Sequence, residues 1–140
     1  GDGSQKKALI KLAKELKIEN QIIFRGHLDN WIHEAIKHDI FINISDREGF
    51  CITVCEAMQA GLPVISTNIG GIKDYGRHLD NMVKLQASDN IHEICKIIKK
   101  LSQDEQLRRV LGQKARNDII NNYSKKIKFD ESLHENINSK

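Results

Sequence analysis

A strand–helix–strand segment near the middle of the chain constrains the fold more than any other part of the sequence. Residues 39–44 form a short apolar run, and residues 63–67 form a second one. Between them, residues 53–60 predict a helix that stops at Gly61, a residue that tolerates the left-handed conformation of a helix end. Two strands joined through a helix indicate a right-handed crossover in a parallel sheet.

The same alternation of helices and strands extends over the rest of the chain. Further strands are predicted over residues 21–25 and 81–85. Further helices are predicted over residues 4–17, 29–37, 90–101, 102–121 and 124–140, and Ser4, Asn90 and Ser102 are the expected capping residues. The pattern is typical of one α/β domain, a parallel sheet covered by helices.

Two glutamates bracket the turn between the first of these strands and its helix. Glu48 and Glu56 have seven residues between them, so Glu48 falls in the turn and Glu56 about one turn into the helix. Ligands of open α/β sheets bind at this carboxyl edge of the strands. The amides of Gly49, Phe50 and Cys51 open the helix, where free amides attract anions. Hydroxyl-binding carboxylates on both sides of a phosphate-binding helix start suggest a nucleotide-sugar site.

The motif and its surroundings resemble a known enzyme family. The segments 48–50, 56–58 and 61–71 (Glu-Gly-Phe, Glu-Ala-Met and Gly-Leu-Pro-Val-Ile-Ser-Thr-Asn-Ile-Gly-Gly) are similar to the E-x7-E region of GT-B glycosyltransferases, and more narrowly to the retaining family 4, or group 1. The glycine turn at residues 1–3 and the segment 21–26 also resemble that family's carboxyl-terminal domain. The resemblance covers roughly residues 1–123 and implies a Rossmann-like parallel sheet with flanking helices.

The resemblance implies roles for individual residues. Glu48 corresponds to the catalytic-site carboxylate that contacts the transferred sugar, whereas the alternative is a solvated loop carboxylate. Glu56 corresponds to the carboxylate that holds the ribose hydroxyls, and the alternative is a glutamate on the helix surface. Gly49 and Phe50 would offer amides to phosphate and sugar. Cys51 stands where the family usually has glycine, so its side chain is expected to narrow the pocket.

Two further segments complete the implied donor site. Gly70 and Gly71 correspond to a loop that closes on the donor diphosphate and sugar, although these residues could also form a simple turn. Asp74 falls where a glutamate usually follows in the family. Arg25 and Gly26 correspond to the turn that contacts the nucleobase through backbone groups, so the identity of Arg25 does not indicate which base is bound.

The resemblance also implies that parts of the family's architecture precede residue 1. We expect residues 1–140 to be a partial carboxyl-terminal domain that lacks its first two strands, the Arg and Lys that hold the donor diphosphate, and the amino-terminal acceptor domain. The two strands would lie between residues 21–25 and 39–44, so those strands pair directly, another chain fills the gap, or the sequence is part of a larger protein. This chain alone is expected to be inactive and to self-associate.

Composition excludes several classes of protein. The 140 residues contain 39% hydrophobic and 29% charged side chains with a net charge of +3, which is typical of a globular domain and gives no reason to expect nucleic-acid binding. No metal site and no cofactor are expected. Cys51 and Cys55, four residues apart, could form a thiolate metal site or a redox pair, but small buried hydrophobic side chains are the preferred interpretation.

The function predicted from these features is that of a donor-binding domain of a retaining glycosyltransferase. It would transfer a sugar from a nucleoside-diphosphate sugar to a glycan or lipid-linked acceptor, in cell-surface polysaccharide synthesis. The expected location is the cytoplasm, with peripheral contact at the inner face of the membrane through the basic carboxyl-terminal helices. A GT-B-fold sugar-nucleotide epimerase and a non-catalytic nucleotide-binding or assembly module are the alternatives.

Overall fold

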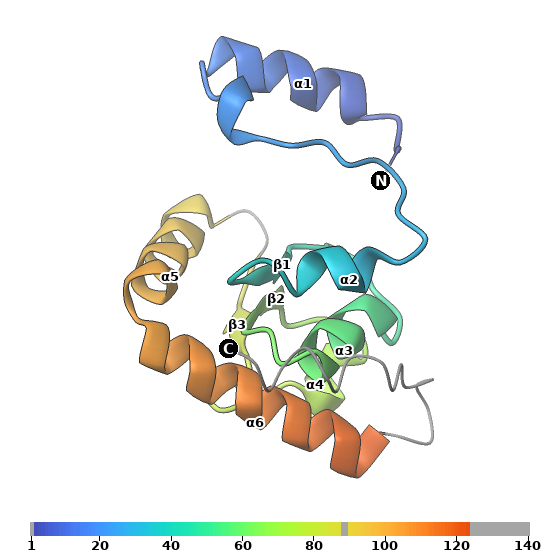
Figure 1. The fold of residues 1–140 in the computed structure, drawn as a ribbon, viewed down its shortest axis with the longest axis vertical. Helices are drawn as coiled ribbons and strands as arrows, with labels where there is room; N and C mark the ends of the chain where they lie inside the picture. Colours follow the sequence, from blue (N-terminus) through green and yellow to red (C-terminus); the bar gives the residue numbers. More distant parts are fainter. Residues whose placement is uncertain (1, 88–89, 124–140) are drawn as a thin grey trace. The chain divides into compact units, whose positions relative to one another are not determined.

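A computed structural model of the chain describes residues 2–87 and 90–123 (Figure 1). The chain divides into two compact units, residues 1–31 and residues 32–140, and each unit is described by itself. The amphipathic helix predicted over residues 124–140 lies outside the described residues.

The first unit contains the helix α1 (Lys6–Glu15) and the short 3-10 helix η1 (Glu19–Gln21). Its helix is amphipathic, but the apolar side chains of Leu9, Leu12 and Leu16 are about half exposed. Among the described residues of this unit, only Ala13 is buried. The prediction that Ser4 caps α1 is wrong, because Gln5 occupies that position and makes no side-chain capping bond.

The strand predicted over residues 21–25 is absent from the structure. Within the described residues, the segment 22–28 forms no strand, and Ile23 is 71% exposed. An apolar run forms a strand only when a neighbouring strand supplies hydrogen-bond partners for its backbone. The sequence pattern of this run is typical of a strand, but within the described residues the run belongs to no sheet.

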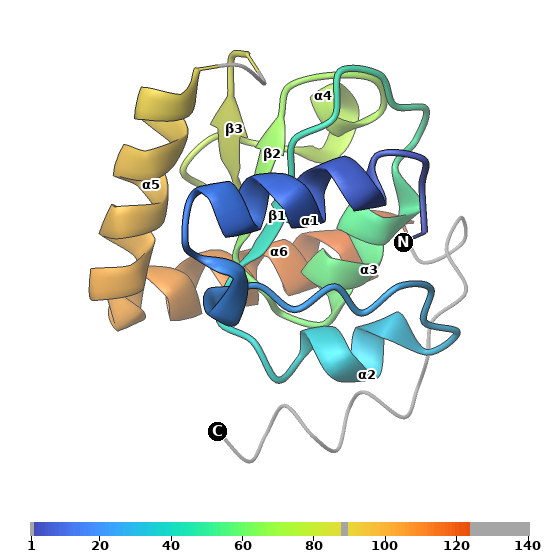
Figure 2. The ribbon, with the colours of Figure 1, turned by 90° about the horizontal axis from the view of Figure 1, so that it is seen from above.

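The second unit holds the sheet and the remaining helices. These are α2 (Trp31–Ala35, which starts at the last residue of the first unit), β1 (Phe41–Asn43), α3 (Ile52–Gln59), β2 (Val64–Thr67), α4 (Ile72–Tyr75), β3 (Val83–Leu85), α5 (Ile91–Gln103) and α6 (Glu105–Tyr123). Figure 2 shows α5 beside the β3 edge of the sheet and α3 on the β1 side. The short helix α4 was not predicted, because its four residues give too few turns for a helical pattern.

The three strands form a parallel sheet in the order β1-β2-β3. Phe41 pairs with Val64 and Ile65 pairs with Val83, so each strand lies next to its neighbour in the sequence. This arrangement confirms the crossovers predicted from the alternation of helices and strands. It also places the loops that follow β1 and β2 at the same edge of the sheet.

The core lies between the sheet and the carboxyl-terminal helices. All four residues of β2 are buried, which is typical of a parallel strand covered on both faces. One apolar cluster joins β2 and β3 to α5 and α6, and its members are Ile65, Val83, Leu85, Ile94, Leu101 and Leu111. The helix α3 packs against β1, β2 and α6, and this contact holds the start of α3 at the carboxyl edge of the sheet.

In the second unit, the helix ends follow local sequence signals in two of the three predicted cases. Gly61 ends α3 with a φ of +76°, and the amides of Gly61 and Leu62 donate to the carbonyls of Met58 and Ala57. Asn90 caps α5 by accepting a hydrogen bond from the Glu93 amide at 3.1 Å, as predicted. Both signals act through nearby backbone groups, so the sequence alone can indicate them.

The third predicted cap, Ser102, is wrong. Ser102 lies inside α5, where its hydroxyl donates to the Lys99 carbonyl at 2.8 Å. Asp104 takes the capping position of α6 and accepts a hydrogen bond from the Leu107 amide at 2.8 Å. Both residue types are good caps, and in the structure α5 continues through Ser102 to Gln103, so that Asp104 precedes α6.

Candidate functional site

The candidate site is centred on the connection between β1 and α3. Glu48 lies in this connection and is half-buried, and Glu56 lies on α3 and is also half-buried. The structure therefore places one carboxylate in the turn after the strand and the other on the helix, as the sequence predicted. Both belong to the segment that leaves the carboxyl edge of the sheet, where α/β domains bind ligands.

The carbonyl oxygens at the start of α3 are held from within the protein. The Gly49 carbonyl accepts a hydrogen bond from the Gly71 amide at 2.7 Å. The Phe50 and Cys51 carbonyls accept hydrogen bonds from the Tyr75 hydroxyl at 3.0 and 3.3 Å. Three successive peptide groups are thereby oriented by contacts with the segment that follows β2.

Cys51 adopts an unusual backbone conformation at the first position before α3. Its φ of 59° and ψ of 68° are left-handed, a region that favours glycine. Its thiol is buried and lies 3.5 Å from the Asn43 side-chain nitrogen and 3.8 Å from the Thr53 hydroxyl. Burial, with a smaller contribution from the nearby Glu48 carboxylate, raises the pKa of the Cys51 thiol. The side chain is therefore a neutral thiol directed toward the end of β1.

Gly70 and Gly71 lie in the loop between β2 and α4, against the segment that carries Glu48. A Cβ atom on Gly70 would lie less than 3.0 Å from the carbonyl oxygens of Glu48 and Gly49, and its φ is +50°. A Cβ atom on Gly71 would lie equally close to the Cα atom of Phe50. Only glycine allows these two loops to approach so closely. The structure thus brings together two segments that the sequence had assigned to one site.

Several polar side chains at this edge of the sheet were not predicted from the sequence. Asn43 ends β1 and donates to the Ser66 hydroxyl at 3.4 Å, while it accepts from the Ser45 hydroxyl at 3.1 Å. Thr67 ends β2 and donates to the Ser45 carbonyl at 2.7 Å. These bonds join the ends of β1 and β2 beneath the glycine loop. Polar residues at the last positions of two neighbouring strands are the signal that could have indicated these contacts.

An aromatic cluster that the sequence did not reveal supports the same loops. The rings of Phe50, Tyr75 and Tyr123 lie 5.4 to 6.2 Å apart between centroids in tilted or edge-on arrangements. Tyr75 is 1% exposed, and burial raises the pKa of its hydroxyl far above the usual range. It is therefore a neutral hydrogen-bond donor. Its contacts, 24 and 25 residues away in sequence, leave no local pattern.

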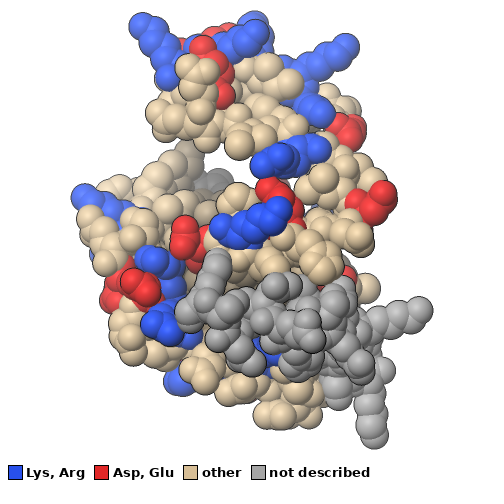
Figure 3. All heavy atoms as spheres, in the orientation of Figure 1, with Lys and Arg blue, Asp and Glu red and all other residues tan. Residues whose placement is uncertain are grey.

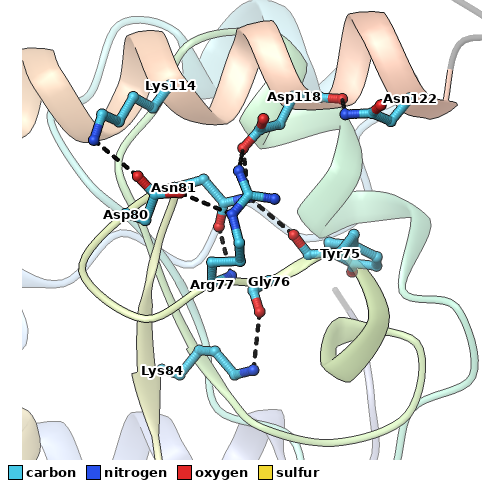
Figure 4. A network of polar contacts seen from close by, with 9 residues as sticks. All are labelled: Tyr75, Gly76, Arg77, Asp80, Asn81, Lys84, Lys114, Asp118 and Asn122. Carbon is cyan, nitrogen blue, oxygen red and sulfur yellow. Dashed lines mark hydrogen bonds and ion pairs between the residues drawn. The ribbon is translucent and has the colours of Figure 1, made fainter.

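A polar network ties α6 to the turn after α4, as Figure 4 shows. Asn81 is fully buried and donates both to the Tyr75 carbonyl at 2.9 Å and to the Asp118 carboxylate at 2.8 Å. Arg77 bonds the same carboxylate and also donates to Asp80 at 2.8 Å. The network fixes the backbone of Tyr75, which in turn contacts the candidate site.

The cysteines fit the interpretation of small apolar side chains. Cys51 and Cys55 are free and buried, whereas Cys95 is exposed. Burial, opposed in part by a hydrogen bond with Tyr75, raises the pKa of Cys55 to about 11. In residues 2–87 and 90–123, no group of three or more His, Cys, Asp and Glu side chains could hold a metal ion. Cys55 is therefore a protonated thiol near neutral pH.

Two predicted site residues lie in the first unit. Gly26 has a φ of +72°, and a Cβ atom there would lie 3.0 Å from a carboxylate oxygen of Asp2. The same carboxylate accepts the His27 amide at 2.9 Å, and its bond with Lys6 lowers the pKa of Asp2. The turn after Arg25 is thus shaped by local contacts, and its part in the site stays a prediction.

The geometry of the second unit defines a Rossmann-like α/β domain with a polar, glycine-lined edge. A family model described as glycosyl transferases group 1 matches residues 1–118 of the chain. The chain belongs to this family of glycosyltransferase enzymes. Its structure is that of the carboxyl-terminal domain of GT-B glycosyltransferases, and the resemblance seen in the sequence is confirmed.

The curated relatives of the chain carry different enzyme names. The chain is 32% identical over 123 residues to N-acetyl-alpha-D-glucosaminyl L-malate synthase of Bacillus anthracis, an alignment that covers 88% of this chain and 32% of that protein. It is 39% identical over 69 residues to the O-antigen biosynthesis glycosyltransferase WclY of Escherichia coli, which covers 49% of this chain and 20% of that one. The chain thus spans a fifth to a third of these relatives.

Solved structures show the same fold. The C-terminal domain of the group 1 glycosyl transferase LpcC of Francisella tularensis has a TM-score of 0.74 at 27% identity, over 87% of this chain and 64% of that one. A mutant of S. aureus TarM, solved in complex with fondaparinux, alpha-GlcNAc-glycerol and UDP, has a TM-score of 0.82 at 25% identity, over 100% of this chain and 28% of that one. No helix within the described residues is long and apolar enough to cross a membrane.

Proposed function

We propose that this chain is the donor-binding part of a retaining glycosyltransferase that uses a nucleoside-diphosphate sugar. The observation that carries the proposal is the close approach of the glycine loop at Gly70 to the carbonyls of Glu48 and Gly49. This contact builds one site from the two loops at the carboxyl edge of β1 and β2. In a member of this family, such a site is suited to a nucleotide-sugar diphosphate.

Each residue of the proposed site has a distinct role. Glu48 orients the sugar, and Glu56 holds the ribose hydroxyls. The amides of Gly49, Phe50 and Cys51 face the diphosphate. The loop with Gly70 and Gly71 closes on the diphosphate and sugar, and Arg25 and Gly26 contact the base.

The reaction proceeds by loss of the diphosphate, while positive charge grows on the anomeric carbon. The contribution of the protein is electrostatic stabilisation of that leaving group, without a metal or cofactor.

The wider role that we propose follows from the names of the relatives. The relatives include proteins of O-antigen and lipopolysaccharide core biosynthesis, and TarM was solved with UDP. We therefore propose a glycan or lipid-linked acceptor, cell-surface polysaccharide synthesis and a cytoplasmic location. On the face of the molecule drawn in Figure 3, Lys and Arg around α5 and α6 are interspersed with Asp and Glu. Peripheral contact with a membrane would therefore depend on local clusters of Lys and Arg on these helices.

The first test concerns Glu56 in the full-length protein. Glu56→Ala should weaken the binding of the free nucleoside diphosphate about ten- to hundredfold, because a charge-assisted hydrogen bond contributes roughly 1.5–3 kcal/mol. Isothermal calorimetry with UDP, GDP and ADP measures the affinity. Glu105→Gln is the matched control, since Glu105 is exposed on α6 and its side chain is 74% accessible. An unchanged affinity in Glu56→Ala would exclude the ribose role.

The second test concerns Glu48 and separates chemistry from nucleotide binding. Glu48→Gln should lower turnover of the sugar nucleotide while the affinity for the bare nucleoside diphosphate stays nearly intact, because Glu48 contacts only the sugar. The rates of sugar transfer and of donor hydrolysis are measured from the amount of nucleotide that is released. Full turnover in this variant would leave Glu48 as a solvated loop residue. A product that is an epimerised sugar nucleotide would favour the epimerase alternative, and binding without turnover in the wild type would favour a non-catalytic module.

A further inference from the structure

The hydroxyl of Tyr75 contacts two successive peptide groups at the start of α3. It donates to the Phe50 carbonyl at 3.0 Å and also lies 3.3 Å from the Cys51 carbonyl. A tyrosine hydroxyl has a single proton, so the two carbonyls share one donor. The Cys51 carbonyl also accepts hydrogen bonds from the Val54 and Cys55 amides of α3, at 3.1 and 3.4 Å, so Tyr75 adds to the helix's own bonds there.

A trans peptide group is planar, and its N–H points opposite to its C=O. The carbonyl of Phe50 shares its peptide plane with the amide of Cys51, and the carbonyl of Cys51 shares its plane with the amide of Ile52. When Tyr75 holds the two carbonyls, these two amides point away from the interior. They are among the first amides of α3, which have no partner within the helix.

Tyr75 is itself held from two sides. Its ring packs against Phe50 and Tyr123 with centroid distances of 5.4 and 6.0 Å. Its backbone carbonyl accepts a hydrogen bond from Asn81, which is anchored to Asp118 of α6 (Figure 4). The hydroxyl thus has little freedom to move, and its position is transmitted to the start of α3.

We propose that Tyr75 is a positioning residue for phosphate binding. Its hydroxyl orients the Cys51 amide, and together with the first turn of α3 the Ile52 amide, toward the diphosphate of the donor without contacting the donor itself. The inference rests on the proposed function, because it takes the start of α3 as the place where the diphosphate binds. In this role, the buried Tyr75 keeps those amides oriented while the diphosphate leaves.

The test is Tyr75→Phe in the full-length protein, which removes the hydroxyl and keeps the ring. Calorimetry compares the affinity for UDP, GDP or ADP, whichever the wild type binds, with the affinity for the matching nucleoside. We expect the dissociation constant of the diphosphate to rise about tenfold and that of the nucleoside to stay unchanged. A hydroxyl with a purely structural role would not produce this difference between the two ligands.

Tyr123→Phe is the matched control. Tyr123 belongs to the same aromatic cluster, but its hydroxyl bonds the Asp74 carbonyl at 3.4 Å instead of the start of α3. This variant should leave both affinities unchanged. Equal losses for nucleoside and diphosphate in Tyr75→Phe, or no loss for either, would overturn the proposal.

A second measurement needs no variant and covers the case in which Tyr75→Phe fails to fold. In amide-resolved NMR of the wild-type protein, the diphosphate should shift the Cys51 and Ile52 amide resonances more strongly than the nucleoside does. Binding of the diphosphate without these shifts would refute the positioning role and the assignment of the Cys51 amide to the diphosphate, while the binding itself would still support a donor-binding domain. A wild type that binds none of the three nucleoside diphosphates would refute the proposed function itself, and the inference with it.

Discussion

At the scale of single residues, Cys51 shows how the start of α3 tolerates a side chain where glycine would be easier. Its left-handed backbone carries a steric penalty for any residue with a Cβ atom. The thiol compensates in part, because it is buried and contacts Asn43 and Thr53. The backbone conformation at this position therefore determines which substitutions are tolerated.

Because of this conformation, we predict that the usual order of stability between alanine and glycine is reversed at position 51. Cys51→Gly should be more stable than Cys51→Ala by about 1 kcal/mol, because both variants lose the thiol but only alanine retains the left-handed strain. In an ordinary helical position, alanine would be the more stable of the two. Urea unfolding of both variants, monitored by circular dichroism, measures the difference. Equal stability, or greater stability of Cys51→Ala, would show that the left-handed conformation carries little strain.

At the scale of elements, the position of α6 against α3 determines how firmly the site is supported. Gly112 of α6 lies so close to the turn at Gly61 that a Cβ atom would approach the Gly61 carbonyl to less than 3.0 Å. Arg116, one turn further along, donates to the Gln59 carbonyl at 2.7 Å. The glycine within α6 thus permits a close contact with the backbone of the turn that ends α3.

We expect Gly112→Ala to destabilise the fold although alanine favours helices. The clash with the Gly61 backbone should lower the free energy of unfolding by about 2–3 kcal/mol, more than the roughly 1 kcal/mol gained in helix propensity. Gln113→Ala is the control, since Gln113 is exposed on the same helix. Thermal unfolding compares the two variants. A Gly112→Ala variant that is as stable as the control would mean that α6 can shift without cost.

At the scale of the whole molecule, the two units differ in how much apolar surface they bury. The second unit has a continuous core from β2 to α6. In the described part of the first unit, Ala13 is the only buried side chain, while Leu9, Leu12 and Leu16 are exposed. A ten-residue helix is marginally stable in water without tertiary contacts.

This difference predicts two levels of local stability in the 140-residue chain. In hydrogen–deuterium exchange, the amides of α1 should exchange within seconds, whereas those of β2 should be protected for hours, because exchange follows local opening. Peptides from α6 serve as an internal reference for a helix that is packed on the core. Protection of α1 equal to that of β2 would contradict the prediction.

The sequence by itself determined the elements that depend on local or periodic signals. The parallel sheet of β1 and β2, the stop at Gly61, the cap at Asn90 and the placement of Glu48 and Glu56 all follow from patterns within a few residues. Such signals act through the backbone and through the side-chain period, so they can be read without knowing the fold.

Only the tertiary structure decided what depends on partners distant in sequence. The segment at residues 22–28 has a strand-like composition but joins no sheet within the described residues, and Asp104 instead of Ser102 caps α6. Tyr75 reaches carbonyls 24 and 25 residues away, and Gly70 permits an approach to Glu48 that no local pattern encodes. The physical reason is that hydrogen bonds and close contacts between loops form only once the core has placed those loops side by side.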